Sequence, residues 1–290
     1  MRLLMFRADG GRRLGALRPG QDDEVVELTD FADMLELIDA GEEGLAAARS
    51  ALSSSGATSH RLKELELLPP LDSPRGNVIA IGRNYQKHAE ETAKLENREP
   101  GPPTIFTKAI TSLTEPHADI TVDPAISQSI DWEVEIAVVI GRSGANIKRA
   151  RALEHVFGYT VLNDVTARDI QSGWGGQFFK GKSLDRTSPT GPWIVTRDEI
   201  EDPQSLDLFL RVNGTVKQQG NTRDMIYPVD AIIEWASVGM TLPRGALIAT
   251  GTPDGVGFAR TPPEFLRPGD VMETEVVGIG KLVNRIVAAG

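Results

Sequence analysis

The chain has 290 residues, with 31 basic and 41 acidic side chains, a formal net charge of −10 and no cysteine. The acidic balance argues against nucleic acid or a membrane surface as a partner, and the lack of thiols excludes disulfides and cysteine-bound metals. No apolar run reaches transmembrane length, and Arg7 and Asp9 interrupt the apolar N-terminal residues, so we expect a cytoplasmic protein.

Residues 1–70 have the pattern of a small α/β domain. Three short apolar runs predict strands, the first two around an Asp-Gly-Gly turn: Leu3–Phe6, Leu14–Leu17 and Val25–Leu28. Apolar residues at helical spacing follow Asp30, which suits an N-cap, and Gly41 suits the stop, with a second helix expected over 43–52. The paired prolines 69 and 70 predict a boundary, so that 71–290 forms a second domain.

The second domain shows mainly short strands between glycine and proline turns, which predicts an α+β, mainly β fold and not a doubly wound one. The β-branched run Val78–Ile81 predicts a buried strand. A polar helix is expected over Gln86–Leu95, and irregular loops over 96–103 and 172–192. The clearest hairpin turn is Asn213-Gly214, between strands at 206–212 and 216–218.

The segment Asp131–Gly141 predicts a strand with two unlike faces. One face is apolar, whereas Glu133 and Glu135 share the other face, roughly 7 Å apart along the strand. Two such carboxylates repel each other unless a cation lies between them, and Mg²⁺, Mn²⁺ and Ca²⁺ prefer carboxylate oxygens. A solvated acidic edge strand explains the same pattern without a metal.

Two further patterns place titratable side chains where they can do chemistry. Asp164 follows an expected strand over 159–163, and it either caps the next turn or adds a third carboxylate to the metal site. His88 and Glu91 lie three residues apart on the predicted helix, so they can form a hydrogen bond that fixes the imidazole tautomer and raises its basicity. An exposed pair on an amphipathic helix is the alternative.

Two glycine-rich segments have the composition of ligand-binding loops. Residues 176–183 match G-x-x-x-x-G-K-[ST], the phosphate-binding loop, which must follow a strand and open a helix. Pro189, Gly191 and Pro192 leave no room for that helix, so the sequence argues against a nucleotide-binding protein. The glycines of 250–257 either let the backbone approach a ligand closely or form a plain turn.

In combination, these segments make the chain resemble the fumarylacetoacetate hydrolase superfamily, in order from about residue 78 to 285. The motifs that carry the resemblance are Ile81–Tyr85 with His88 and Glu91, Phe106–Lys108, Trp132–Glu135, Asn163–Asp169, Gly181–Asp185, Val212–Gly214 with Gln218 and Thr222, and Thr250–Pro253. The resemblance implies a mixed β-roll catalytic domain, a small N-terminal domain of the kind that many members carry, and a homodimer.

The resemblance also implies a set of site residues. The metal, Mg²⁺ or Mn²⁺ with Ca²⁺ as a substitute, would be held by Glu133, Glu135 and Asp164. His88 with Glu91 would activate water, on a segment that often behaves as a lid, and Lys182 matches the family's active-site lysine. We expect five further residues to contact the substrate: Arg83, Tyr85, Lys108, Gln218 and Thr252.

The expected reaction is hydrolysis of a C–C bond in a β-diketo acid, such as an acylpyruvate or fumarylpyruvate from aromatic compound breakdown, through an enolate held by the metal. His88 would take a proton from water, and Lys182 would stabilise the developing oxyanion. Decarboxylation of oxaloacetate-like acids, isomerisation of hydroxymuconate-like dienes, and a metal-binding protein without catalysis stay open. Leu184, Gln219 and Arg223 depart from the family pattern and leave the substrate open.

Overall fold

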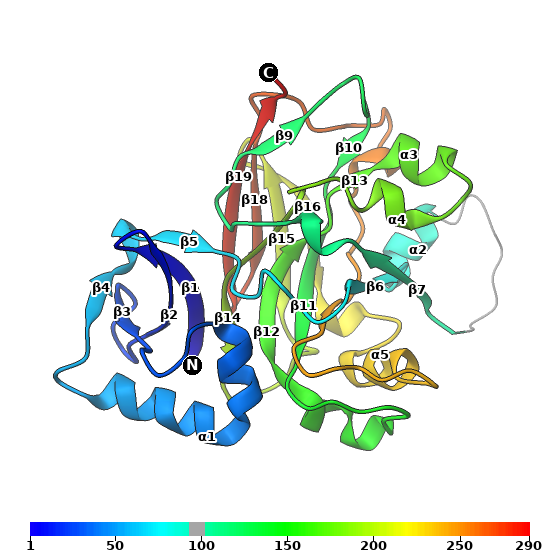
Figure 1. The fold of residues 1–290 in the computed structure, drawn as a ribbon. Helices are drawn as coiled ribbons and strands as arrows, with labels where there is room; N and C mark the ends of the chain where they lie inside the picture. Colours follow the sequence, from blue (N-terminus) through cyan, green and yellow to red (C-terminus); the bar gives the residue numbers. More distant parts are fainter. Residues whose placement is uncertain (93–101) are drawn as a thin grey trace.

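The computed structural model describes residues 1–92 and 102–290 and consists mainly of strands (Figure 1). The strands of these residues form a 12-stranded, a five-stranded and a two-stranded sheet. The α+β, mainly β class predicted from the sequence is therefore confirmed. No helix in the described ranges combines the length and the apolar character needed to cross a membrane.

The N-terminal strands form one end of the large sheet, in the order β4-β3-β2-β1 with β5 also paired to β1. Their bounds are β1 (Arg2–Ala8), β2 (Gly11–Leu17), β3 (Glu24–Glu27), β4 (Ser59–Arg61) and β5 (Glu66–Leu68). The β1–β2 hairpin turns through Asp9 and Gly10, whose φ angles of 48° and 72° are those that a tight hairpin turn requires. The predicted turn is confirmed.

Helix α1 (Met34–Ser53) packs on these strands, and Leu37 and Ile38 are part of the core that contains Leu3. Asp33 caps the helix, since its carboxylate accepts a hydrogen bond from the Glu36 amide at 2.9 Å, so the predicted cap at Asp30 is wrong. Gly41, with a φ of 59° and a ψ of −133°, is not helical and divides α1 into two helical segments, so the predicted stop at Gly41 and the second helix after it are confirmed.

Strand β1 connects the N-terminal strands to the rest of the sheet. It pairs antiparallel with β14 (Ser188–Thr196), with Leu3 opposite Ile194. One buried cluster contains Leu37 of the N-terminal region together with Val139 and Leu162 of the central strands. In Figure 1 the blue strands and α1 lie to one side of these central strands. The domain division at residue 70 stays a prediction, and a shared sheet and core cross it.

The central part of the sheet has the order β14-β12-β11-β17-β6-β7. Its remaining strands are β12 (Val156–Asn163), β11 (Val134–Ile140), β17 (Leu247–Ala249), β6 (Val78–Gly82) and β7 (Thr104–Lys108). All seven residues of β11 are buried, because β12 and β17 flank it and apolar clusters cover both of its faces. The strand predicted around Glu135 is therefore a central one, and the alternative of a solvated acidic edge is wrong.

The five-stranded sheet packs against the central strands, and Leu208 and Leu210 share a core cluster with Ile136 and Val138. Its order is β16 (Thr215–Asn221), β15 (Asp207–Val212), β18 (Val271–Val276), β19 (Gly280–Ala288) and β9 (Ile120–Val122). The predicted β15–β16 hairpin at Asn213-Gly214 is confirmed, with φ angles of 52° and 75°. The two-stranded sheet pairs β10 (Ile130–Asp131) with β13 (Thr166–Ala167).

Short helices complete the fold: α2 (Gln86–Thr92), α3 (Arg168–Gly173), α4 (Phe178–Gly181) and α5 (Val229–Ala236). The remaining elements are β8 (Leu113–Thr114) and the 3₁₀ turns η1 (Leu62–Glu64), η3 (Ile110–Ser112), η4 (Arg149–His155), η5 (Arg197–Glu199), η6 (Thr222–Asp224) and η7 (Gly257–Ala259). The C-terminal part of the helix predicted over 86–95, with Leu95, and the predicted loop from 96 to 101 lie outside the described residues.

The loop predicted over 172–192 is only partly a loop, because α4 and the start of β14 fall within it. The loop was predicted from the glycines and prolines of this segment. Pro192 is tolerated because it lies where the pairing of β14 with β12 shifts register, between the pairs Tyr159–Val195 and Val161–Gly191.

Candidate active site

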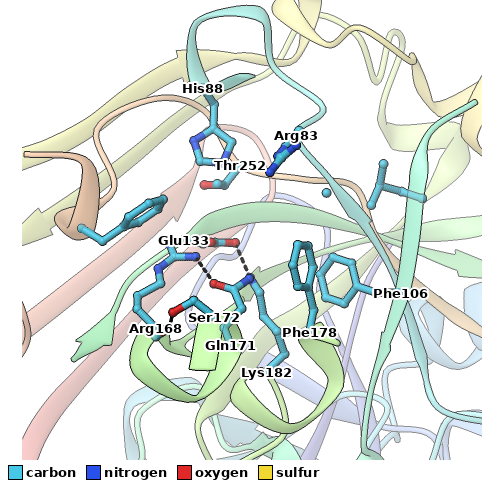
Figure 2. A pocket seen from close by; sticks show the side chains of 13 residues that line it. Arg83, His88, Phe106, Glu133, Arg168, Gln171, Ser172, Phe178, Lys182 and Thr252 are labelled. Carbon is cyan, nitrogen blue, oxygen red and sulfur yellow. Dashed lines mark hydrogen bonds and ion pairs between the residues drawn. The ribbon is translucent and has the colours of Figure 1, made fainter. Parts of the chain in front are cut away.

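A pocket of about 170 Å³ lies where β6, β7, α2, α3 and α4 approach one another (Figure 2). Phe106, Phe178 and Phe258 give it an apolar wall, and the rings of Phe106 and Phe178 meet edge to face with centroids 5.4 Å apart. Small-molecule pockets usually measure about 300–1,000 Å³, so this pocket suits a ligand of only a few carbon atoms.

Three buried carboxylates converge beside the pocket. Glu133 directly precedes β11, Glu135 lies within it and Asp164 directly follows β12. The pairing of these strands brings the three together, and the Asp164 amide donates to the Glu133 carbonyl at 2.9 Å. One oxygen of each carboxylate lies within 4.8 Å of those of the other two. The structure thus brings the three predicted metal ligands together.

The donor set fits Mg²⁺ or Mn²⁺, which prefer carboxylate oxygens at a spacing that one ion can span. Burial raises the pKa of Glu135 well above its ordinary value, and the negative charges of Asp164 and Glu133 raise it further. A divalent cation would reverse this effect, because it supplies the largest positive charge in such a site. The Asp164 side chain accepts hydrogen bonds from two lysines, which disfavours the alternative that it caps a turn.

The two lysines neutralise part of the carboxylate charge. Lys182 Nζ donates to Glu133 Oε2 at 2.7 Å and to Asp164 Oδ2 at 2.8 Å. Lys108 Nζ donates to Asp164 Oδ1 at 2.5 Å and to the carbonyl of Lys182. Burial lowers the pKa of Lys108. Burial also acts to lower the pKa of Lys182, but Asp164 and Glu133 outweigh it and raise that pKa.

Glu133 lies between Lys182 and Arg168, a residue that sequence reasoning missed as part of the site (Figure 2). Arg168 Nη2 lies 2.6 Å from Glu133 Oε1, and Arg168 Nε donates to Asp131 at 2.8 Å. Burial acts to raise the pKa of Glu133, but the charges of Lys182 and Arg168 outweigh it and lower that pKa to about 2. The guanidinium carbon also lies 4.3 Å from the ring centroid of Phe258.

Arg168 belongs to a motif that carried the family resemblance, four residues after Asp164, and that position was the available signal. Gln171 and Ser172, one turn further along α3, also line the pocket and were missed. Gln171 accepts a hydrogen bond from Arg168 Nη1 at 3.0 Å. A helix of six residues has too short a pattern to reveal which of its faces is functional.

His88 and Glu91 form the predicted hydrogen bond. Nδ1 of His88 lies 2.8 Å from Glu91 Oε1, and the histidine is buried and lines the pocket. The Gly255 amide donates to both oxygens of Glu91, at 3.2 and 3.1 Å. The alternative of an exposed pair on an amphipathic helix is therefore wrong. In Figure 2 His88 and Arg83 lie across the pocket from Glu133 and Lys182.

Residues 176–183, which match the sequence pattern of a phosphate-binding loop, do not form such a loop. α4 spans only Phe178–Gly181 and ends where Lys182 begins, whereas a phosphate-binding loop needs its lysine at the opening of a helix. Lys182 instead points at the carboxylates. The argument against a nucleotide-binding loop is confirmed.

The five predicted substrate contacts fall into two groups. Arg83 and Thr252 line the pocket, and Arg83 has a φ of 56°, a conformation often found at functional sites. Tyr85, Lys108 and Gln218 are buried outside the pocket lining. Within the described chain the Tyr85 hydroxyl has no hydrogen-bond partner. A substrate contact by any of these five residues stays a prediction.

Residues 77–287 match the family model of the fumarylacetoacetate hydrolase C-terminal domain. The chain is similar to oxaloacetate tautomerase YisK of Bacillus subtilis, with 45% identity over 232 residues that cover 80% of this chain and 76% of that protein. Its fold is similar to the solved fumarylacetoacetate hydrolase from Exiguobacterium antarcticum, with a TM-score of 0.86, 38% identity and complete coverage of both chains. It is also similar to maleylpyruvate hydrolase from Sphingobium sp. SYK-6, solved with manganese(II) and pyruvate, with a TM-score of 0.83, 29% identity and complete coverage of both chains.

Proposed function

The chain belongs to the fumarylacetoacetate hydrolase family, and on that premise we propose that it is a divalent-metal enzyme that catalyses keto–enol tautomerisation of a small, oxaloacetate-like 2-oxo acid. The observation that carries the proposal is the 170 Å³ pocket, which joins a histidine–glutamate pair to a buried carboxylate cluster and several cations. A relative with 45% identity is an oxaloacetate tautomerase, which supports this choice among the reactions of the family.

Glu133, Glu135 and Asp164 would hold the Mg²⁺ or Mn²⁺ ion. Such an ion supplies Lewis-acid polarisation of a carbonyl oxygen, which acidifies the neighbouring C–H bond. The manganese(II) in the similar maleylpyruvate hydrolase supports Mn²⁺ as one suitable ion.

His88 would carry the proton. Tautomerisation moves one proton between the oxygen on carbon 2 and carbon 3, so the substrate neither gains nor loses atoms. Glu91 holds Nδ1 at 2.8 Å, which favours the tautomer with hydrogen on Nδ1 and assigns proton exchange to Nε2. The negative charge of Glu91 stabilises the imidazolium that forms when His88 accepts the proton.

The cations of the pocket would bind and orient the acid. Arg83, Arg168 and Lys182 all line it, and their positive charges suit a substrate with two carboxylates. Arg168 is held by Asp131 and Glu133, so its guanidinium is already oriented before the substrate arrives. Lys182 is positioned to stabilise negative charge that develops on the substrate oxygen.

Hydrolysis of a C–C bond in a β-diketo acid is the second candidate, favoured by the similarity to maleylpyruvate hydrolase. In that reaction His88 would take a proton from water, the hydroxide would add to the distal carbonyl, and the C–C bond would break to release a carboxylic acid and an enolate. The small pocket is the reason to place it second, because a diketo acid needs more room than a four-carbon acid.

A substrate panel tests the two candidates directly. Enol oxaloacetate, acylpyruvates and hydroxymuconates would be offered with Mg²⁺, with Mn²⁺ and with a chelator, and both ultraviolet absorbance and the products would be followed. We expect metal-dependent loss of the oxaloacetate enol without release of CO₂. Release of pyruvate from acylpyruvates would favour hydrolysis, and release of CO₂ would favour decarboxylation. A pure binding protein would turn over none of these compounds.

The resemblance implies a homodimer, and the lack of a long apolar run in the sequence favours a cytoplasmic location; both stay predictions. The chain has a mass of 31.4 kDa, so a dimer has twice that mass in light scattering. An elution mass of one chain would contradict the dimer.

A further inference from the structure

One segment touches both halves of the candidate active site. We call residues 250–258, which directly follow β17, the β17 loop. Its Gly251 amide donates to Glu135 Oε2 at 2.8 Å, and its Gly255 amide donates to both oxygens of Glu91. The loop therefore holds a candidate metal ligand with one peptide group and the partner of His88 with another.

The side chain of Gln218 fastens this loop to the strand that carries the metal ligands. Gln218 Nε2 donates to Thr252 Oγ1 at 2.9 Å and to the Pro253 carbonyl at 2.8 Å. Its Oε1 accepts from the Val134 amide at 3.0 Å. Val134 lies between Glu133 and Glu135, so the Gln218 amide joins the centre of the carboxylate cluster to the β17 loop.

A second connection runs parallel to the first. Thr252 Oγ1 donates to the Val134 carbonyl at 2.9 Å, so the Val134 residue is held on both its amide and its carbonyl. Both hydrogens of the Gln218 amide and its oxygen are engaged by protein groups, and the residue is 1% exposed. This geometry differs from the substrate contact that the sequence predicts for Gln218.

The backbone of β16 lies against the same loop and leaves it little freedom. A Cβ at Gly255 would lie 2.2 Å from the Lys217 carbonyl oxygen, and a Cβ at Gly220 would lie 2.5 Å from the Pro253 Cβ. Gln218 thus reaches from the second sheet into a close-packed junction. A shift of its amide would be transmitted to the loop and not absorbed by empty space.

We infer that Gln218 is a positioning residue, which holds the β17 loop against β11 and thereby fixes the His88–Glu91 pair relative to the metal ligands. The structural part of this inference stands on hydrogen bonds alone, and the effect on turnover rests on the proposed function. Misplacement of a catalytic group by about 1 Å can cost roughly 100-fold in rate, so the effect is measurable.

The experiment compares Gln218→Met with Gln219→Met, its exposed neighbour on the opposite face of β16. Hydrogen–deuterium exchange of the β17-loop amides, with Mn²⁺ present, should accelerate about tenfold or more in Gln218→Met and stay unchanged in Gln219→Met. With enol oxaloacetate, kcat of Gln218→Met should fall about 10- to 100-fold, while KM stays within about twofold of the unmodified enzyme because no substrate contact is lost.

A double-mutant cycle with His88→Ala separates positioning from general damage. If Gln218 acts through the histidine pair, Gln218→Met should cost no further kcat in the His88→Ala background. An equal loss in both backgrounds, a raised KM with normal kcat, or unchanged exchange in the loop would overturn the inference. Turnover that survives His88→Ala would instead count against the proposed function, and the exchange result would still decide the role of Gln218.

The experiment includes a second variant, because the apolar side chain of Gln218→Met among these polar groups can impair folding. Thr252→Val breaks the bond to the Val134 carbonyl and removes one acceptor of Gln218 while conserving size. It should accelerate exchange in the same loop, and protection equal to that of the unmodified protein would contradict the inference.

Discussion

At the scale of single residues, Glu135 is the candidate metal ligand whose negative charge is least neutralised by neighbouring cations. Lysines pair with Glu133 and Asp164, whereas the hydrogen bond to Glu135 comes from the Gly251 amide. Its raised pKa means that protons compete with a metal for this carboxylate. We expect Mn²⁺ binding to release protons, detected by calorimetry in buffers of different ionisation enthalpy, and Glu135→Gln to weaken binding more than about tenfold. Unchanged affinity would exclude Glu135 as a ligand.

The same two glutamates predict opposite effects of pH on metal-free stability. The lowered pKa of Glu133, about 2, stabilises the fold above its ordinary pKa, and this contribution is lost as pH falls toward 2. The raised pKa of Glu135 makes the folded state bind more protons, so stability falls as pH rises above the ordinary glutamate pKa. Melting temperatures of metal-free Glu135→Gln should decline less toward neutral pH than those of the unmodified protein. Parallel curves would contradict this account.

His88 should matter for proton transfer and not for metal binding. It lines the pocket and pairs with Glu91, while the candidate ligands are carboxylates. His88→Ala should bind Mn²⁺ normally and lose roughly 10²–10⁴ in kcat, the usual contribution of a positioned acid or base. Calorimetry and steady-state rates measure the two effects separately. Decarboxylation that survives in His88→Ala would favour a decarboxylase, because that reaction does not require His88 to move a proton from water or from a C–H bond.

At the scale of elements, the β17 loop contains a position, residue 255, that only glycine can occupy without strain. Gly255 has a φ of 98°, and its Cβ position lies 2.2 Å from a backbone oxygen, so alanine must displace the amide that holds Glu91. Gly214 also has a positive φ, 75°, but open space around its Cβ position. Gly214→Ala should lose roughly 1–2 kcal/mol of stability from the strained backbone, and Gly255→Ala should lose more because of the added clash. Only Gly255→Ala should also lose kcat, in matched denaturation and rate measurements.

The sequence could predict elements whose cause is local. The Asn213-Gly214 hairpin and the β1–β2 turn depend on two residues each, and both were correct. The period-two pattern around Glu135 predicted a strand, but not that β12 and β17 would bury it, because pairing between distant strands leaves no periodic trace. Asp30 and Asp33 are both suitable cap residues, but only Asp33 is followed three residues later by a glutamate, Glu36, the capping-box spacing that the prediction overlooked.

The site was predictable in a similar way. The carboxylates and the histidine pair have spacings that reveal them, since i, i+2 on a strand and i, i+3 on a helix put side chains together. Arg168 had only its place in a family motif as a signal, and the positions of Lys108 and Gln218 behind the pocket were not predictable. The position of each depends on how distant segments of the chain pack together. The residue type of a lysine or glutamine does not show whether its side chain faces a substrate or another side chain.

At the scale of the whole molecule, the N-terminal strands and the catalytic strands share one sheet and one core, so we expect them to unfold together. Leu3 is fully buried in β1, which pairs with β14 of the catalytic region. Leu3→Ala should cost about 2–5 kcal/mol, as large-to-small changes in cores usually do.

The four tryptophans make this expectation testable, because all of them, Trp132, Trp174, Trp193 and Trp235, lie beyond residue 70. Trp193 packs against the N-terminal strands, and its ring centroid lies 5.8 Å from the Arg2 guanidinium, so the measurement uses a Trp193→Phe background, in which the three remaining tryptophans report the catalytic region. If the two regions form one cooperative unit, Leu3→Ala shifts the fluorescence-detected denaturation midpoint as far as the midpoint from circular dichroism. If the N-terminal strands unfold as an independent domain, the dichroism changes early while the fluorescence transition stays in place. The pairing of Leu3 with Ile194 favours the first result, since losing β1 would leave an edge of β14 unpaired and expose the core beneath it.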